Sequence, residues 1–474
     1  MELWKHQQEA LERASALNEF ALLFEMGTGK TRTTIEMMRQ KYAQHGRILK
    51  TLIVGPPIIM ENWKREIAKF SNIPSRSVSV LSASGKKRAE LLEKNGFDGK
   101  ATVPHVFITP YSTFLMEPML KLLKKWQPEL VVIDEMHKIK DPTSKTHKRL
   151  VSITDHAQYR FGLTGTPVLN KPSDLFGQFR MLTAGAPEPK GFGKSLTEFR
   201  KKYMYDANAG MPAAIHYPDW QMRPDAEARV KEVVFTRAMA VKKEECLDLP
   251  PLVKKRIFVP LTKEQHRHYR EMEKDFITYV KDTACVAEFA MTKVMRLQQI
   301  VSGHLKLDDG SIKELKETER EKALEELLTE ITPHEKVIVW AVFHQDYSVI
   351  RRVCEKHAIG YTEISGACSA TQRVEAVDSF NTDPDCRVLI GHPAAGGIGI
   401  NLVAASTMIY YSRSFSLGDD LQSEARNYRG GSEIHQKITR IDLVSPGTVD
   451  EEILEALANK QSVAERVLTI YRGK

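Results

Sequence analysis

A glycine-containing loop near the amino terminus, FEMGTGKT at residues 24–31, has residue types that could bind phosphate. The usual pattern is G-x-x-x-x-G-K-[ST]; Gly29, Lys30 and Thr31 fill its last three places, whereas Phe24 replaces the first glycine. An apolar run precedes the loop and a helix-forming stretch follows it, as the pattern requires. Backbone N–H groups at the helix start would face the phosphates, Lys30 would bridge the outer phosphates, and Thr31 would ligate magnesium. The alternative is a surface turn in which glycines relieve strain.

A pair of carboxylates ends another apolar run, LVVIDEMH at residues 130–137. The carboxyl end of a strand is where an open α/β sheet places its ligands. Asp134 would hold magnesium, directly or through water, and Glu135 would orient and deprotonate an attacking water. A solvated strand end with two charges is the alternative, but the combination with the loop favours ATP hydrolysis.

The apolar runs predict the elements that must position these residues. FALLF, TLIVG, HVFIT and LVVID in the first third, and KVIVWAVF, RVLIG and STMIYY near the end, are typical of buried parallel strands. Two α/β halves follow, at residues 1–248 and 249–474, with an aromatic-rich insertion at about 190–235 and a helical insertion at about 262–330. The double proline of CLDLPPLVKKRIFVPL predicts the hinge between the halves.

The composition excludes several other classes of protein. The 474 residues include 69 Lys plus Arg and 61 Asp plus Glu, and the resulting net charge of +8 favours nucleic acid only weakly. The five cysteines show no C-x-x-C spacing, so neither a disulfide framework nor a zinc site is predicted. No apolar stretch is long enough to span a bilayer, and the first residues form an amphipathic helix pattern rather than a signal peptide. A soluble intracellular protein is expected.

Five motifs occur in an order that resembles helicase superfamily two: MGTGKT, DEMH, LTGTP, GGIGINL and QSEARNYRGG. Members of that superfamily tolerate another residue at the first place of the loop, so Phe24 does not disqualify the site. LWKHQ, DEMHKIKDPTSKTHK and DLQSEARNYR resemble the glutamine, acidic and arginine motifs of its Swi/Snf-type branch. The resemblance covers nearly the whole chain. It implies two tandem RecA-like parallel-sheet domains of the α/β class with a mainly helical insertion between them.

The resemblance also implies a role for individual residues. The amide of Gln7 would recognise adenine. Arg426 and Arg429, three residues apart and therefore on one helical face, would act as arginine fingers at the γ-phosphate. Solvated surface arginines are the alternative.

The implied site residues form four groups. Nucleotide-binding residues are Gln7, Gly27, Thr28, Gly29, Lys30, Thr31, Asp134, Glu135 and Gly399. Catalytic residues are Lys30, Glu135, Arg426 and Arg429, and the magnesium ligands are Thr31 and Asp134. Relays between nucleotide and nucleic acid are His137, Thr164, Gly165 and Thr166, for which a capped turn and a satisfied core histidine are the alternatives. Contacts to the phosphate backbone, without reading sequence, are Lys64, Thr109, Ser112, Gly396, Gly397 and Asn401.

Some features depart from the family pattern or leave two readings open. RGGS replaces the usual R-I-G-Q after the arginine motif, Phe415 stands where a tryptophan is usual, and GHPAAGG is one residue longer than usual. Trp63 is expected in the core rather than as a base-stacking platform. The stretch FRKKYMYDANAGMPAAIHYPDWQM is either a nucleic-acid surface or the packed base of a protrusion.

The function predicted from these features is that of an ATP- and magnesium-dependent motor that translocates on duplex DNA independently of sequence. One alternative is a strand-unwinding or branch-migrating helicase on DNA or RNA, and another is a nucleotide-gated binding module. The expected protein is a monomer without membrane contact, its protein partners unspecified. Its compact form resembles phage-encoded members, which indicates a viral or bacterial source and a cytoplasmic, nucleoid-associated location.

Overall fold

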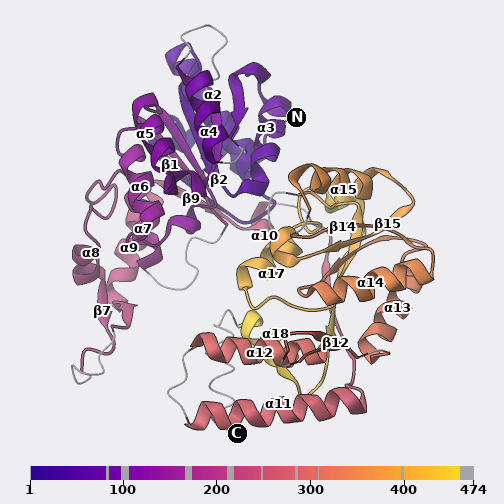
Figure 1. Cartoon of the computed structure of the whole chain (residues 1–474). Helices are drawn as coiled ribbons and strands as arrows, with labels where there is room; N and C mark the ends of the chain where they lie inside the picture. Colours follow the sequence, from indigo (N-terminus) through magenta and orange to yellow (C-terminus); the bar gives the residue numbers. More distant parts are fainter. Residues whose placement is uncertain are drawn as a thin grey trace. The chain divides into compact units, whose positions relative to one another are not determined.

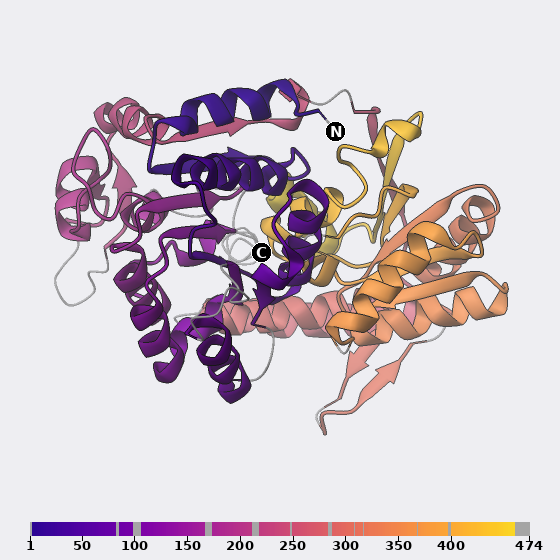
Figure 2. The same cartoon turned by 90° about the horizontal axis from the view of Figure 1, so that it is seen from above.

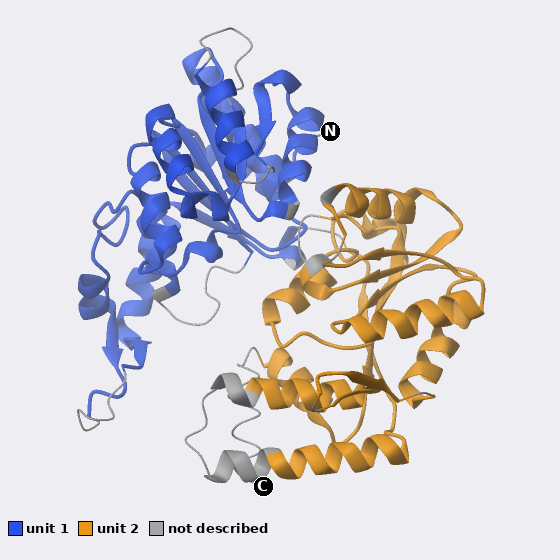
Figure 3. Ribbon diagram, viewed as in Figure 1, with its two compact units in different colours: residues 1–247 blue, residues 248–474 orange. Residues whose placement is uncertain are grey.

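A computed structural model provides the fold of the chain. It describes residues 2–81, 85–97, 106–165, 173–210, 218–246, 249–282, 287–307, 309–315, 317–366, 368–396 and 400–459. The chain divides into two compact units, Met1–Leu247 and Asp248–Lys474 (Figure 3). Each unit is built around its own parallel sheet.

The first unit has a seven-stranded sheet in the order β3-β4-β2-β5-β6-β1-β9, with every neighbouring pair parallel (Figure 1). The strands are β1 Glu19–Phe24, β2 Thr51–Gly55, β3 Val78–Val80, β4 Val106–Pro110, β5 Leu130–Asp134, β6 Tyr159–Leu163 and β9 Ala238–Val241. The helices are α1 Lys5–Ser15, α2 Lys30–His45, α3 Met60–Phe70, α4 Gly85–Gly96, α5 Glu117–Trp126, α6 Lys145–Thr154, α7 Ser173–Leu182, α8 Leu196–Tyr203, α9 Glu227–Phe235 and α10 Lys243–Cys246. Single 3₁₀ turns are η1 Pro57–Ile59, η2 Ser75–Ser77, η3 Tyr111–Leu115, η4 Met136–Ile139 and η5 Pro224–Ala226.

The apolar runs become strands because they are buried on both faces. Every residue of β2, β4, β5 and β6 is buried, which leaves no polar side for solvent. Helix α1 runs beside β9, the edge strand of this sheet (Figure 2). Arg13 of α1 donates a hydrogen bond to Ala238 O of β9 at 3.0 Å. Helix α7 approaches η4 so closely that a Cβ on Gly177 would lie 2.1 Å from Lys140 O. Glycine is therefore required where α7 meets the segment that follows β5.

The aromatic-rich insertion is anchored by packed rings. Phe192, Phe199 and Tyr203 are buried, with ring centroids 5.0 to 5.7 Å apart. Strands β7 Met204–Asp206 and β8 Trp220–Met222 form an antiparallel hairpin beyond them. Phe199 and Tyr203 are therefore packed, as the packed-base interpretation predicts, whereas Tyr205 is exposed and residues 211–217 lie outside the described part of the chain.

The second unit has a six-stranded sheet in the order β10-β17-β16-β13-β15-β14, again entirely parallel. The strands are β10 Leu252–Phe258, β13 Lys336–Trp340, β14 Gly360–Ile364, β15 Cys386–Gly391, β16 Ala405–Tyr410 and β17 Ile438–Val444. Beside them run α13 Glu319–Ile331, α14 His344–Lys356, α15 Ala370–Thr382, α16 Pro393–Gly396, α17 Leu417–Glu424, η6 Ser432–Ile434 and α18 Val449–Ala458. The prediction of two parallel-sheet α/β domains is confirmed.

The inserted segment of the second unit is mainly helical, as predicted. It comprises α11 Lys263–Asp282, α12 Ala287–Val301 and a hairpin of β11 His304–Lys306 and β12 Ile312–Glu314. These helices and α18 share a core separate from that of the sheet, in which the hydroxyl of buried Tyr269 accepts a 2.8 Å hydrogen bond from Val449 N. The predicted hinge is partly wrong, because β10 lies within it and pairs with β17.

Two absences hold for the described residues. None of their helices has the length and hydropathy needed to cross a membrane. Their four cysteines, Cys246, Cys354, Cys368 and Cys386, form no disulfide.

Candidate nucleotide site and arginine segment

The phosphate-type loop leaves β1 at Phe24, a fully buried residue whose ring meets that of His6 at 5.4 Å. The first position of the motif therefore belongs to the strand and the core. Gly27 and Gly29 have φ values of 85° and 84°, in the left-handed region. A Cβ on Gly29 would also lie 2.3 Å from Gln7 Nε2, so both conformation and space require glycine there.

Side chains of helix α1 hold the loop by hydrogen bonds to the backbone carbonyl groups of the loop. Gln7 Nε2 donates to Gly29 O at 3.3 Å, and a ring nitrogen of His6 is bonded to Thr28 O at 2.9 Å. Gln7 Oε1 accepts a bond from Trp4 N at 2.9 Å, which orients the amide. The sequence prediction missed His6, although it precedes the predicted glutamine directly. Thr28 is buried, and its hydroxyl donates to Glu25 O at 2.7 Å, so this side chain serves the loop itself.

Lys30 begins α2, and its ammonium lies within the loop. It donates to Phe24 O at 2.9 Å and to Glu25 O at 3.2 Å. Gly165, which follows β6, is close enough that a Cβ there would lie 3.3 Å from Phe24 O and 3.6 Å from Lys30 Nζ. The ends of β1 and β6 thus meet at this lysine. Thr31 is partly buried in the first turn of α2.

Asp134 is the last residue of β5 and is 8 % exposed. Its Oδ2 accepts a hydrogen bond from Trp63 Nε1 at 2.8 Å, and its Oδ1 accepts one from Glu135 N at 2.9 Å. Burial, together with the neighbouring charge of Glu135, raises the pKa of Asp134 to about 7. Trp63 is buried as predicted, but its indole also orients Asp134, and no spacing in the sequence indicates that contact.

Glu135 has φ 55°, which is uncommon for a residue with a side chain. The Tyr111 hydroxyl holds this backbone, donating to Asp134 O at 2.6 Å and to Glu135 O at 3.2 Å. His137 Nδ1 lies 3.2 Å from Glu135 Oε2 and 3.1 Å from Thr164 Oγ1. A continuous set of polar contacts therefore connects the ends of β5 and β6. Of the predicted relay residues, Thr166 lies outside the described part of the chain.

The predicted nucleic-acid contacts of the first unit differ in accessibility. Lys64 on α3 and Ser112 in η3 are exposed. Thr109 has no exposed surface, and its Oγ1 lies 2.7 Å from Thr113 Oγ1. This burial contradicts the prediction that Thr109 contacts a phosphate. The hydroxyl completes a buried network in which Arg88 donates to Thr113 Oγ1 at 2.8 Å.

The arginine motif of the second unit is not helical where predicted. Helix α17 ends at Glu424, so Arg426 and Arg429 lie in the turns that follow and share no helical face. The chain leaves the helix because Arg426 O accepts a bond from Leu402 N at 2.9 Å, and Gly431 at φ 105° turns it again. Both guanidinium groups nevertheless donate to Ile400 O, at 3.4 and 3.3 Å.

The remaining predicted residues of the second unit adjoin this segment. Gly396 ends α16 and Asn401 is exposed. Gly397 and Gly399 lie outside the described residues.

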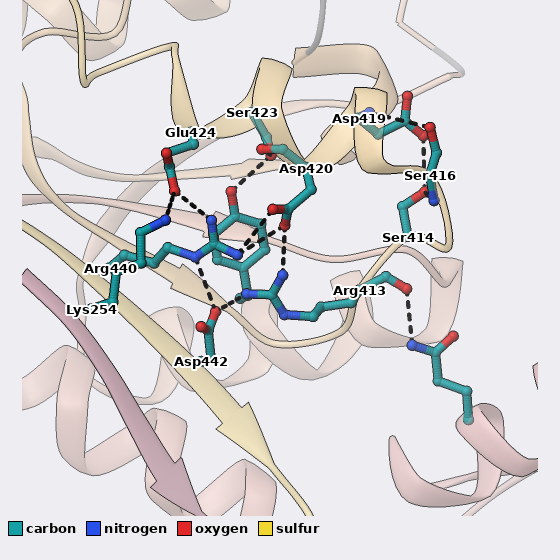
Figure 4. Close-up of polar contacts among 12 residues, drawn as sticks. Lys254, Arg413, Ser414, Ser416, Asp419, Asp420, Ser423, Glu424, Arg440 and Asp442 are labelled. Atoms are coloured by element: carbon teal, nitrogen blue, oxygen red, sulfur yellow. Dashed lines mark hydrogen bonds and ion pairs between the residues drawn. The ribbon is translucent and has the colours of Figure 1, made fainter. Parts of the chain in front are cut away.

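A buried network of charges fixes α17 to its sheet (Figure 4). Arg440 of β17 pairs with Asp420 and Glu424 of α17, and Arg413 pairs with Asp420 and with Asp442 of β17. Both guanidinium groups lie over the Tyr410 ring, 4.4 and 4.5 Å from its centroid. Burial alone would raise the pKa of Asp420, but Arg413 and Arg440 outweigh it and the pKa is lowered. Lys254 also pairs with Glu424, and the sequence did not predict this network because its members are spread from residue 254 to residue 442.

The fold and this geometry define an α/β protein whose phosphate-type loop lies beside strand-end carboxylates. A model of the SNF2-related domain matches residues 6–319, and one of the helicase conserved C-terminal domain matches residues 319–431. Because the first match covers more than half of the chain, the chain belongs to the SNF2-related family. The resemblance to the Swi/Snf-type branch is confirmed.

Several relatives are similar over nearly the whole chain. An "Uncharacterized ATP-dependent helicase" of Mycoplasma pneumoniae is 26% identical over 98% of this chain and 42% of the relative. "Chromodomain-helicase-DNA-binding protein 1-like" of Danio rerio is 25% identical over 94% of this chain and 41% of the relative. "DNA repair and recombination protein RAD54B" of Homo sapiens is 24% identical over 94% of this chain and 52% of the relative. The chain therefore spans about half of these relatives or less.

Among solved structures, the "SWI2/SNF2 ATPase core in complex with dsDNA" of Sulfolobus solfataricus matches at a TM-score of 0.44 and 22% identity. That match covers 100% of this chain and 94% of the other.

Proposed function

We propose that this chain is an ATP-driven motor that translocates on duplex DNA. The observation that supports it most is the meeting of three motifs in the first unit: Lys30 adjoins Gly165, and Glu135 connects through His137 to Thr164. Membership of the SNF2-related family supplies the class of reaction.

In this proposal the loop holds the phosphates of ATP. The fit is favourable, because Gly27 and Gly29 supply the left-handed backbone of the loop without Cβ atoms at those two positions, and the Lys30 ammonium lies at the loop, where it donates to Phe24 O and Glu25 O. Thr31 and Asp134 would hold magnesium, which would supply positive charge to the outer phosphates. Gln7 is proposed to recognise adenine, although its amide already bonds to the loop.

Glu135 is proposed as the general base that removes a proton from the attacking water. Its strained backbone is held by Tyr111, and its carboxylate lies 3.2 Å from the His137 ring. A base must be held within hydrogen-bond reach of the proton that it removes, and this support fixes the direction of the side chain. His137 and Thr164 would then transmit a change at Glu135 to the end of β6.

Arg426 and Arg429 are proposed to stabilise negative charge that develops on the γ-phosphate. Their shared contact at Ile400 O indicates that they act as a pair. The network of Arg413, Arg440 and Asp420 would position them, since it anchors the helix that leads into the segment.

Duplex DNA is the proposed track. The names of two relatives refer to DNA binding or DNA repair, and exposed Lys64 and Ser112 are available for phosphate contacts. Binding without base contacts would be independent of sequence. RNA as an alternative partner, the monomeric state, a phage or bacterial source and a cytoplasmic location stay predictions of the sequence.

Two assays on one preparation test this function. Release of a third strand from a DNA triplex reports translocation, and separation of a forked duplex reports unwinding. We expect ATP-dependent triplex release with little unwinding, and ATPase activity stimulated by duplex DNA. Robust fork unwinding, or stimulation by RNA alone, would replace the translocase with a helicase. No hydrolysis with any nucleic acid would leave a nucleotide-gated binding module.

A further inference from the structure

The second unit contains a cavity of about 420 Å³ at the amino ends of four adjacent strands. Lys437 precedes β17, Ser406 lies near the start of β16, Lys336 begins β13, and Arg387 is the second residue of β15. Segment 411–416 and helix α17 follow the opposite, carboxyl end of β16. The cavity therefore lies at the amino ends of these strands, opposite the strand end from which the chain enters α17.

The lining of this cavity is strongly basic. Five of its ten residues carry basic side chains: His334, Lys336, Arg387, His435 and Lys437. Its one carboxylate, Glu335, already accepts hydrogen bonds from the hydroxyls of Ser406 and Thr407. The lining thus has a positive excess even with both histidines neutral.

Among the residues that the structure describes, no ion pair joins Lys336, Arg387 or Lys437 of the cavity to a carboxylate. Lys336 donates to two carbonyl groups, Phe380 O at 2.6 Å and Asp383 O at 2.5 Å, which solvate the ammonium without cancelling its charge. Arg387 is partly buried, where an uncompensated charge is unfavourable. An external anion would relieve this cost.

The size and rim of the cavity limit the kind of anion. Small-molecule pockets usually measure about 300 to 1,000 Å³, so this one suits a single nucleotide rather than a duplex. Ile434, on the rim, is 73% exposed and offers an apolar surface to a flat group. His435 already bonds to Val403 O at 2.7 Å through Nε2, which leaves Nδ1 as the other polar atom of the ring.

We propose that this cavity binds a phosphate ester of nucleotide size, with Arg387 and Lys437 on the phosphate. The ester is either a free nucleotide or one nucleotide of a single strand, and the same chemistry recognises both. The inference does not depend on ATP hydrolysis in the first unit. The cavity would be a second ligand site, and the segment 432–437, which immediately follows the arginine motif, supplies part of its lining.

The test measures binding by the full chain carrying Lys30→Ala, which weakens phosphate binding at the candidate loop. The two probes are thymidine monophosphate, followed by calorimetry, and a fluorescent ten-nucleotide oligothymidine, followed by anisotropy. The cavity variant is Arg387→Gln with Lys437→Gln. The control is Lys255→Gln with Arg256→Gln, which removes the same charge from exposed positions of β10.

We expect the cavity variant to bind at least one probe about tenfold more weakly than the control. For the oligonucleotide, the slope of log affinity against log salt should fall by roughly 0.7, because both side chains are placed on the same phosphate. Loss of monophosphate binding identifies a free nucleotide as the ligand, and loss of oligonucleotide binding alone identifies a strand. Equal binding by the cavity variant and the control, or no binding of either probe by the parent, would overturn the proposal.

A second variant tests the site independently, in case the double substitution disturbs the fold. Ile434→Glu places a carboxylate on the rim at an exposed position, so the core stays intact. It should weaken the same probe while the thermal unfolding midpoint stays that of the parent. Unchanged binding by Ile434→Glu would also contradict the proposed site.

Discussion

Asp134 of the first unit and Asp420 of the second are buried to the same degree, at 8 and 9 % exposed, yet their surroundings act on them in opposite directions. Asp134 accepts hydrogen bonds from an indole and a backbone amide and has Glu135 beside it; its pKa is raised to about 7. Asp420 lies between two guanidinium groups, and its pKa is lowered.

The difference separates two uses of a buried carboxylate. A carboxylate paired with arginine is a structural element, because removing either partner leaves the other charge uncompensated. A carboxylate that is held in place by hydrogen bonds but has little compensating positive charge can bind a cation from solution. Groups with shifted pKa values of this kind are common at functional sites. The following experiments test this distinction, beginning with the largest expected effect.

Replacement of Lys30 should have the largest effect. Lys30→Ala removes the cation of the loop, and we expect phosphate release to fall below detection at saturating duplex DNA, because no other residue of the loop carries positive charge. Lys121→Ala, at an exposed position of α5, is the matched control and should hydrolyse ATP at the parent rate. Activity of Lys30→Ala equal to that of the control would remove the loop from the proposed site.

The arginine pair should come next. Arg426→Ala and Arg429→Ala should each lower the turnover number roughly a thousandfold, while the dissociation constant for ATP changes much less, since the charge acts on the transition state. Steady-state hydrolysis and nucleotide titration separate the two quantities. Arg256→Ala is the control. Near-parental turnover in both variants would show that the contacts to Ile400 O are purely structural.

The charge network predicts a loss of stability. Asp420→Leu removes the carboxylate that Arg413 and Arg440 share, leaving them with Asp442 and Glu424, and we expect the free energy of unfolding of the second unit to fall by about 3 kcal/mol, the lower end of the range for a broken buried pair. Urea unfolding followed by circular dichroism measures it. Lys254→Met is the control within the same network; its side chain is 55% exposed, so its pair with Glu424 should contribute less than about 1 kcal/mol. Equal effects of the two substitutions would contradict the structural reading of Asp420.

The smallest effect is a dependence of stability on pH at Asp134. Its folded pKa of about 7 lies above the unfolded value of about 3.9, so the native state binds more protons between these values and loses stability as pH rises through that range. In EDTA, the melting temperature of Asp134→Asn minus that of the parent should therefore increase between pH 5 and pH 8. If this difference in melting temperature is independent of pH, a positive charge already compensates the Asp134 carboxylate and its pKa is not raised in the folded state. Added magnesium should reduce the slope, because it favours the ionised carboxylate.

The sequence predicts best those features that are local or periodic. Continuous apolar runs such as LVVID gave the strands of both sheets, because a strand covered on both faces has no polar positions. The loop and the strand-end acids were located by spacing alone. The side chains that hold these residues in place were not predicted. His6 contacts Thr28 O across 22 residues of sequence and Trp63 contacts Asp134 across 71, and no short sequence pattern encodes such contacts.

Two errors have a common physical cause. The resemblance implied a phosphate contact for Thr109, but its hydroxyl is buried against Thr113, which Arg88 also contacts. Arg426 and Arg429 were placed on one helix from their spacing, but hydrogen bonds to the segment around Leu402 end the helix earlier. In both cases tertiary hydrogen bonds outweighed a local preference.

The contacts of α1 with the loop also determine the direction in which successive peptide planes face. In a trans peptide the carbonyl and the following N–H point in opposite directions. Because Thr28 O and Gly29 O are turned toward His6 and Gln7, the N–H groups of Gly29 and Lys30 must point away from α1. Two adjacent N–H groups that face the same way form a small anion-attracting concavity. Removal of α1 would free the Thr28–Gly29 peptide plane to rotate, whereas Gly29 O would still accept a hydrogen bond from Thr33 N, so the concavity would lose one of its two fixed N–H groups although every residue of the loop remained in place.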